Sequence, residues 1–211
     1  MEVKQFPYEG YRINEYLLVL PLPEDLHHKI LAIKEEFSEK YKTSYSRFMK
    51  PHITLVNFLG LDMIEEMLIH RLQTIAMGIN PFKIELRDYG SFPSHTLFVN
   101  VVSKLPILDL VKQIKIAQGL MKLSKDNKPH FIEEPHIVIA RKLKPWQYEQ
   151  SWLEYSHRHF TGRFITDGML LLKRPAGSKS SFQITKRMEF LNLPGTSAIV
   201  NRQSSMFGNP A

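Results

Sequence analysis

The chain of 211 residues is long enough for one ordinary domain or for two small lobes that share a core. Hydrophobic residues make up 43% and charged residues 23%, a balance that excludes general disorder. The absence of cysteine excludes disulfides, thiolate nucleophiles and cysteine-ligated metal sites, while a net charge of +7 modestly favours an anionic partner.

The first half of the chain alternates predicted strands and helices. Strands are predicted from short apolar, β-branched or alternating runs, and helices from apolar residues that recur every three or four positions. In chain order the strands cover residues 16–20, 51–58 and 82–86, and the helices begin near residues 24 and 62. Asp62 with Glu65 resembles a capping box at the start of the second helix.

The second half continues the same alternation. Its strands are expected at residues 96–102, 135–142, 164–172 and 182–190, and its helices at 107–121 and 145–162. The last helix begins at Pro145, which suits the first helical turn, and is expected to bury Trp152, Leu153 and Phe160. Residues 191–211 contain no acidic residue and predict an extended C-terminal tail.

An internal repeat is the most informative feature of the sequence. The segments 51–56 (PHITLV) and 135–140 (PHIVIA) match at Pro, His and Ile, with an offset of 84 in the numbering. The same offset carries the helix starts at 24 and 62 to 108 and 146, and the strand at 82 to 166. The sequence therefore predicts a duplicated unit: one domain, 1–190, made of two pseudo-symmetric lobes of about 14–92 and 93–190, followed by the tail 191–211.

Each repeat contributes one histidine near the start of a strand. Side chains alternate along a strand, so His52, Thr54, Val56 and Phe58 are expected on one face, as are His136, Val138 and Ala140. Two opposed imidazoles can act as general acid and general base at neutral pH, which is the pair of roles that cleavage of a phosphodiester requires. Pseudo-symmetry leaves open which histidine has which role.

Two His-x-Thr/Ser-type strands in a duplicated α+β chain of this length resemble the 2H phosphoesterase superfamily, and more narrowly its 2′-5′ RNA ligase and cyclic phosphodiesterase branch. His52-Ile53-Thr54-Leu55 with Phe58-Leu59-Gly60 is similar to the first family motif, and Pro135-His136-Ile137 with Ala140-Arg141 to part of the second. The resemblance implies a bilobal α+β fold with a central cleft, no metal and no cofactor. It also implies hydrolysis of 2′,3′-cyclic or related phosphodiesters by both histidines.

Val138 stands where the family has Thr or Ser. A valine donates no hydrogen bond, and the loss of one donor to a charged phosphate costs about 1–3 kcal/mol. Three functions therefore stay open: a phosphodiesterase, a nucleotide- or RNA-binding protein with weakened catalysis, and a cyclic phosphodiesterase that acts on a small metabolite. The expected partner is a nucleotide or RNA with a cyclic phosphate or a 2′-5′ linkage.

The remaining site candidates each have an alternative. Thr54 is expected to contact phosphate, and Phe58 either stacks on a nucleobase or packs in the core. Arg141 pairs with phosphate only if the strand bends or ends there, because its parity is opposite to that of His136, and it is otherwise a surface arginine. The basic stretches 40–50 and 122–128 either flank the cleft or are solvated loops. Met63, Met67 and Met77 are expected in the core.

No basic-then-apolar signal pattern and no apolar run of about 18 residues is present in the sequence. The paired histidines elsewhere in the chain do not converge on one ion, so no metal site is expected. We expect a cytoplasmic monomer that does not associate with membranes.

Overall fold

The computed structural model describes residues 11–43, 50–124 and 126–193. These residues form antiparallel strands and helices in alternation, as the sequence predicts. In chain order the elements are β1 (Ile13–Pro21), α1 (Glu24–Tyr41), β2 (His52–Leu61), η1 (Asp62–Ile64), α2 (Glu65–Met77), β3 (Phe82–Phe92), β4 (Thr96–Val101), α3 (Lys104–Ile114), η2 (Lys115–Met121), β5 (His130–Phe131), β6 (His136–Arg141), α4 (Pro145–Tyr155), β7 (Thr161–Thr166), β8 (Gly168–Pro175) and β9 (Gln183–Glu189).

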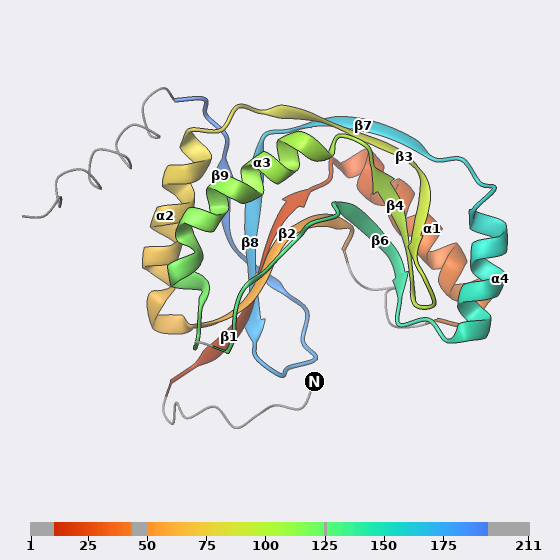
Figure 1. Ribbon diagram of the computed structural model, residues 1–211, viewed down its shortest axis with the longest axis horizontal. Coiled ribbons are helices and arrows are strands. Elements are labelled where there is room, and N and C mark those ends of the chain that lie inside the picture. The colour runs from red at the N-terminus through yellow and green to blue at the C-terminus, as the bar shows by residue number, and fades with distance from the viewer. Residues whose placement is uncertain (1–10, 44–49, 125, 194–211) are drawn as a thin grey trace, which may run out of the picture.

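The strands form two antiparallel sheets. The first sheet has the order β5-β2-β1-β8-β9, and the second has the order β6-β4-β3-β7. Figure 1 shows α2 and α3 beside the first sheet and α1 and α4 beside the second. The predicted α+β class is therefore confirmed.

Strands are exchanged between the two halves of the chain. β3, from the first half, pairs with β4 in the second sheet, and β8, from the second half, pairs with β1 in the first sheet. The helices also pack against strands of the other half. α1, from the first half, packs against β6, and α3, from the second half, packs against β2. The two sheets therefore do not coincide with the two sequence halves, and the lobe boundary near residue 92 stays a prediction about the repeat.

The predicted single strand 164–172 is wrong. β7 ends at Thr166 and β8 begins at Gly168, and the two strands belong to different sheets. A side chain at Gly168 would place its Cβ 2.6 Å from the Met188 carbonyl oxygen, so only glycine fits where the chain changes sheets. The sequence is apolar both before and after residue 167, so the apolar pattern does not reveal the break between the two strands.

The offset of 84 holds for the histidine strands but not for the helices. α3 begins at residue 104 and α4 at 145, which lie 80 positions after the starts of α1 and α2 at 24 and 65. The offset changes on both sides of the histidine strand. The connection before it is four residues longer in the second half, 122–135 against 42–51. The distance from the start of the histidine strand to the next α-helix is four residues shorter there, from 136 to 145 against 52 to 65.

Helix α4 is shorter than predicted. It ends at Tyr155, so the buried Phe160 and the nearby His157 and His159 lie beyond it. Leu153 is 72% exposed, so its expected burial is also wrong. Pro145 does lie in the first turn, as predicted.

The acidic pair at the start of α2 serves tertiary contacts instead of a capping box. Asn14 Nδ2 donates to Asp62 Oδ1 at 2.8 Å, and the hydroxyl of buried Tyr16 donates to Glu65 Oε2 at 3.0 Å. Lys173 Nζ lies 2.7 Å from the same Glu65 oxygen. These carboxylates therefore hold the start of α2 to β1 and β8.

Not all methionines lie in the core. Met63 and Met67 are 71% and 62% exposed, respectively, whereas Met121 and Met169 are fully buried. The first two occupy the solvent side of η1 and α2, whose buried residues are Leu68, Leu72 and Ala76.

The tail prediction can be followed as far as residue 193. The backbone of Asn192 and Leu193 donates hydrogen bonds to the carbonyls of Ile79 and Met77, at 3.0 and 2.8 Å. Residues 194–211 lie outside the described residues. Within the described ranges, no helix combines the length and the apolar character needed to cross a bilayer.

Candidate functional site

The two predicted histidines occupy equivalent places in the two sheets. His52 is the first residue of β2 and His136 the first residue of β6, and each is half-buried. β2 and β6 lie against each other where the two sheets meet, and the charge of His136 acts on His52. The fold therefore brings together two histidines that lie far apart in the sequence.

Both imidazoles are oriented by the same backbone contact. His52 Nδ1 lies 2.8 Å from the carbonyl oxygen of Lys50, and His136 Nδ1 lies 2.6 Å from that of Glu134. A carbonyl only accepts hydrogen bonds, so each Nδ1 must carry the proton. Each neutral ring therefore presents an unprotonated Nε2, which is the atom that accepts or, once protonated, returns a proton.

A β-bulge follows each histidine by three positions. In the pairing of β2 with β1, Val56 lies opposite Leu18 and Thr54 opposite Val19, which leaves Leu55 as the extra residue. The pairing of β6 with β4 skips Ile139 in the same way. Each bulge inverts the alternation of the strand beyond it, so the parity that the sequence predicts holds only before the bulge.

The bulge in β2 corrects two expectations. Beyond Leu55 the buried side chains are Val56 and Phe58, which therefore lie on the face opposite to His52. Phe58 is 3% exposed and stacks on Tyr16 with 5.2 Å between ring centroids, so it is a core residue and does not face a nucleobase. In β6 the same inversion buries Ala140.

The bulge in β6 brings Arg141 to the face of His136. The sequence parity requires the strand to bend for this contact, and the extra residue Ile139 supplies that change. The positive charge of Arg141 acts on His52 across the junction of the sheets. The equivalent residue in β2, by the offset of the repeat, is Asn57.

Thr54 and Val138 lie between the histidine and the bulge of each strand. Both are half-buried and share the face of their own histidine. Thr54 lies opposite Val19, and Val138 lies opposite Phe98. The structure therefore places one hydroxyl and one valine at matching positions beside the two imidazoles.

The environment of His52 favours its neutral form. Burial lowers the pKa of His52 to about 4, although its hydrogen bond to the Lys50 carbonyl opposes the shift. The charges of Lys34, Arg141 and His136 contribute to this lowering of the His52 pKa. His52 is therefore unprotonated over most of the pH range.

His136 differs from His52 in its neighbours, which are aromatic rings and a carboxylate. Its ring contacts Phe98 and Phe92, with centroid distances of 4.8 and 5.0 Å. Burial lowers the pKa of His136, whereas the backbone hydrogen bond and the carboxylate of Glu134 raise it. Glu134 also pairs with Lys104 at the start of α3.

A glycine beneath these aromatic rings makes the packing possible. A Cβ at Gly90 would lie 2.3 Å from Asn100 Oδ1 and 2.5 Å from the Phe98 ring. Phe98 is one of the rings on His136, and Asn100 is paired with His136 across the strands. Any side chain at residue 90 would therefore displace the contacts that position this histidine.

Sequence reasoning missed Lys34. It lies on the buried face of α1 and is 3% exposed, and its charge acts on His52 while that of Arg141 acts on it. The available signal was its position, because Leu26, Ile30 and Phe37 mark an apolar helix face that Lys34 interrupts. His130 begins β5 and pairs with Asn57, which places it on the face of His52.

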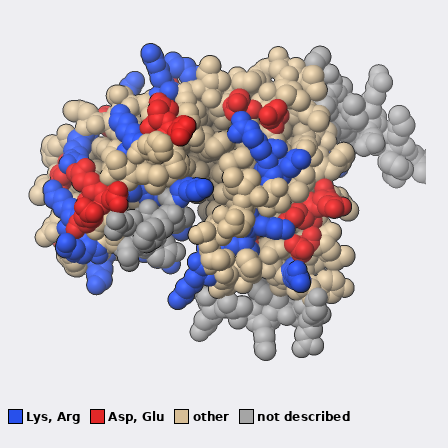
Figure 2. Space-filling model, turned by 180° about the vertical axis from the view of Figure 1, so that it is seen from behind, with Lys and Arg blue, Asp and Glu red and all other residues tan. Residues whose placement is uncertain are grey.

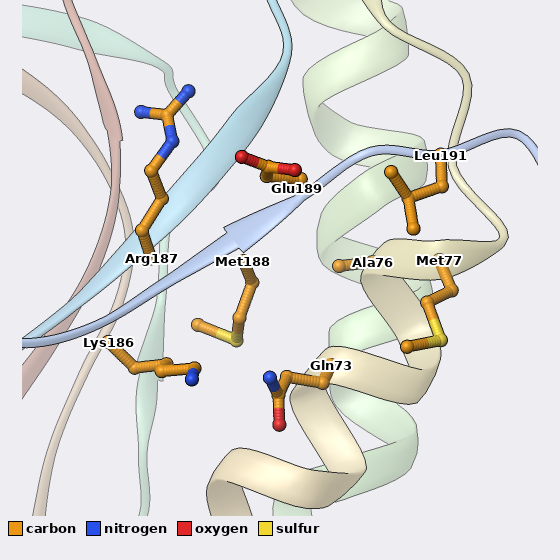
Figure 3. Close-up of a pocket in the computed structure, with 8 residues that line it drawn as sticks. All are labelled: Gln73, Ala76, Met77, Lys186, Arg187, Met188, Glu189 and Leu191. Carbon is orange, nitrogen blue, oxygen red and sulfur yellow. The ribbon is translucent and has the colours of Figure 1, made fainter.

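A surface hollow lies apart from the two histidines. A hollow of about 230 Å³ between α2 and β9 is lined by Gln73 and Met77 on one side and by Lys186 to Glu189 on the other (Figure 3). Neither histidine lines it. No group of three His, Asp or Glu residues is arranged to hold a metal ion in the part of the chain that the structure describes.

The charge surplus does not form one patch on the face seen in Figure 2. There, Lys and Arg side chains are spread over the surface and interspersed with Asp and Glu. The prediction that the basic stretches 40–50 and 122–128 flank the site includes residues 44–49 and 125, which lie outside the described residues, and it stays a prediction.

Comparison with known proteins gives a family match over most of the chain. Residues 22–178 match the model of the 2′-5′ RNA ligase superfamily. A Bacillus cytotoxicus protein named "putative phosphoesterase" is 31% identical over 107 residues, which are 50% of this chain and 59% of that protein. The alignment thus covers little more than half the length of this relative.

Solved structures share the fold at low sequence identity. The Thermus thermophilus protein TT0787 matches with a TM-score of 0.61 and 15% identity, covering 84% of this chain and 98% of that one. Escherichia coli LigT, solved with 3′-AMP, matches with a TM-score of 0.56 and 14% identity, covering 85% of this chain and 98% of that one. These likenesses concern the fold alone.

Proposed function

Because the chain belongs to the 2′-5′ RNA ligase superfamily, we propose that it is a phosphodiesterase that hydrolyses a 2′,3′-cyclic phosphate or a related phosphodiester of a nucleotide or RNA. The observation that carries the proposal is the matched orientation of His52 and His136. Both rings donate from Nδ1 to a backbone carbonyl two positions earlier, and so both keep Nε2 for proton transfer.

His52 is assigned as the general base. Its low pKa keeps it neutral, so Nε2 can take a proton from a water molecule as the water oxygen attacks phosphorus. A base with a pKa of about 4 is weak, but it is almost fully in the required form at neutral pH.

His136 is assigned as the general acid. Burial lowers the pKa of both rings, but the carbonyl and carboxylate of Glu134 favour the protonated form of His136, whereas nearby cations further disfavour the protonated form of His52. As the new P–O bond to water forms, the bond from phosphorus to the 2′ or 3′ oxygen breaks, and the proton of His136 moves to that leaving oxygen. One proton is thus taken up by His52 and one is released from His136.

Thr54 and Arg141 are assigned to the anionic phosphate oxygens. The Thr54 hydroxyl donates a hydrogen bond from the face of His52, and the Arg141 guanidinium supplies a charged donor from the other strand. Val138 lines the site and supplies no donor. We therefore expect slower turnover than a site with a hydroxyl at both positions would give.

The nature of related proteins supports a nucleotide as substrate. LigT has been solved with 3′-AMP, with NADP+ and with ATP, and a relative of this chain is named as a phosphoesterase. Phe58 has no part in base recognition, since it is buried. Recognition by base stacking would need a different aromatic residue.

A second candidate function is nucleotide or RNA binding without efficient turnover. The specific observation that favours it is Val138, which supplies no hydroxyl donor at the position that matches Thr54. The cost of about 1–3 kcal/mol corresponds to one or two decades in rate, so it weakens catalysis and does not abolish it.

The test is hydrolysis of 2′,3′-cyclic nucleotides by the purified protein in the presence of a chelator. We expect turnover in the wild type, with loss in His52→Ala and in His136→Ala. Binding without turnover in both the wild type and Val138→Thr would reject catalysis on this substrate. Turnover that appears only in Val138→Thr would instead support the binding protein. Product analysis by chromatography identifies whether the 2′ or the 3′ oxygen leaves.

A further inference from the structure

A lysine occupies a core position of α1. Lys34 is 3% exposed and lies on the same buried helix face as Ile30 and Phe37, which are 0% and 1% exposed. This face of the helix packs toward β6, the strand that carries His136 and Arg141. Charged side chains are rarely buried to this extent, because removal of an ammonium group from water is costly.

The other half of the chain shows that packing does not require this charge. α3 packs on β2 as α1 packs on β6. The eleventh residue of α1 is Lys34, and the eleventh residue of α3 is Ile114, which is fully buried. The same buried helix position is therefore occupied by an aliphatic side chain in α3 and by a lysine in α1.

The groups that act on Lys34 are gathered around His52. Arg141, from β6, acts on Lys34, and both cations act on His52, from β2. Burial and the charge of Arg141 lower the pKa of Lys34 to about 8. On the same helix, the pKa of His27 is lowered by burial and also by the charges of Lys34 and of Lys50, which lies just before β2.

Positive groups from α1 and β6 thus converge beside one histidine. The charges of Lys34 and Arg141 repel each other, and an anion that binds beside both reduces this repulsion. The phosphodiester that the site is proposed to hydrolyse carries such a negative charge. An ammonium is also a strong hydrogen-bond donor to phosphate oxygen.

We propose that Lys34 is a substrate-binding residue, which holds the anionic oxygens of the phosphodiester together with Arg141 on the His52 side of the site. The assignment rests on the proposed function. It gives the site a second charged donor, and this donor offsets the hydroxyl that Val138 does not provide.

The assignment has a pH signature. Lys34 is protonated below about pH 8 and loses its charge above it. Anion affinity is therefore greatest below that pH and falls as the pH rises through it. The pKa values of His52, His136 and His27 are lowered from 6.5, so these histidines are already neutral in this range.

The experiment is calorimetric titration of the full chain with sulfate, whose charge is the same at pH 7 and pH 9. For Lys34→Met we expect an affinity at pH 7 that is about tenfold lower or weaker still. The matched control is Lys40→Met, which removes the same charge from the same helix at a side chain that is 52% exposed and pairs with Glu154. The control is expected to bind sulfate like the wild type.

Thermal unfolding separates binding from structure. We expect Lys34→Met to melt at the same or a higher temperature than the wild type, because it replaces a buried charge with an apolar side chain. Lys34→Arg keeps the charge at pH 9, so its sulfate affinity is expected to lose the decline between pH 7 and pH 9. If Lys34→Met does not fold, the pH dependence of Lys34→Arg decides the question.

Two results would overturn the proposal: unchanged sulfate affinity in a folded Lys34→Met, or an alkaline decline that persists in Lys34→Arg. Sulfate binding does not require turnover. A wild type that binds sulfate through Lys34 but leaves 2′,3′-cyclic nucleotides intact would therefore refute the hydrolytic function and keep the binding role.

Discussion

The strands β2 and β6 have nearly the same backbone but different surroundings. Each begins with a histidine whose Nδ1 contacts a carbonyl two positions earlier, and each has a bulge three positions later. The side chains around the two imidazoles are not equivalent. The difference teaches that a duplicated backbone can position two identical groups and still give them different proton affinities.

The asymmetry is consistent along both strands. On the side of His52 lie the cations Lys34 and Arg141, whereas His136 is packed between aromatic rings and approached by Glu134. The hydroxyl is at Thr54 and is absent at the matching Val138. One side is thus suited to hold the phosphate and accept a proton, and the other to donate one.

The largest expected effect is the removal of either imidazole. His52→Ala and His136→Ala should each lower kcat for a 2′,3′-cyclic nucleotide by about 10²–10⁴-fold, because each removes a general acid or base. Steady-state hydrolysis measures this loss. A variant that retains more than a tenth of the wild-type rate would exclude its histidine from proton transfer.

The pH profile of kcat/KM sharpens the comparison further. His52 must be unprotonated, so activity rises as the pH increases through about 4. His136 must be protonated, so activity falls as the pH increases through its pKa, which lies below 6.5. We expect an acidic optimum between these limits, and an alkaline optimum would contradict the assignment of roles.

The matched positions Thr54 and Val138 give the next effect. Thr54→Val should lower kcat/KM by one to two decades, because it removes a donor to the phosphate. Val138→Thr should raise it within the same range by adding one. The comparison fails if both substitutions leave the rate unchanged, since the two positions would then not contact the phosphate.

The packing beneath His136 is tested by a small substitution. Gly90→Ala places a methyl group where Asn100 and the Phe98 ring now lie, so we expect a loss of about 1–3 kcal/mol in the free energy of unfolding. Turnover should fall as well, because Phe98 contacts His136. Gly119→Ala is the control, since no atom lies within 4 Å of its added Cβ. Denaturant unfolding of both variants provides the measurement.

The smallest expected effect is a shift in one pKa. Arg141→Gln removes a cation that acts on His52, so the pKa of His52 should rise while that of His136 changes less. Histidine-resolved NMR titration detects this difference. Equal shifts at both rings would mean that Arg141 does not distinguish the two sides.

The sequence pattern predicts the family and most of the element order, but it does not predict β5 or the break between β7 and β8. Local apolar periodicity is enough for β1, α1 and β2, and the repeated Pro-His-Ile identifies the two strands that begin with a histidine. Parity beyond residues 55 and 139 was wrong because a bulge inserts one residue without altering the β-like composition. Phe58 was therefore placed on the wrong face, and the bend that Arg141 requires was left undetermined.

Other parts of the site depend on long-range pairing. The exchange of β3 and β8 between the sheets brings the two halves together, and no local pattern encodes which sheet a strand joins. Lys34 was overlooked because a lysine in a helix is usually on the solvent side. Only its position between apolar residues marked it as buried.

The most direct test of the unequal histidine pair is an NMR titration of both imidazoles in the ligand-free wild type. The account predicts that His52 titrates near pH 4 and that His136 titrates at a higher pH, still below 6.5. Equal midpoints, or a midpoint for His136 below that of His52, would contradict it.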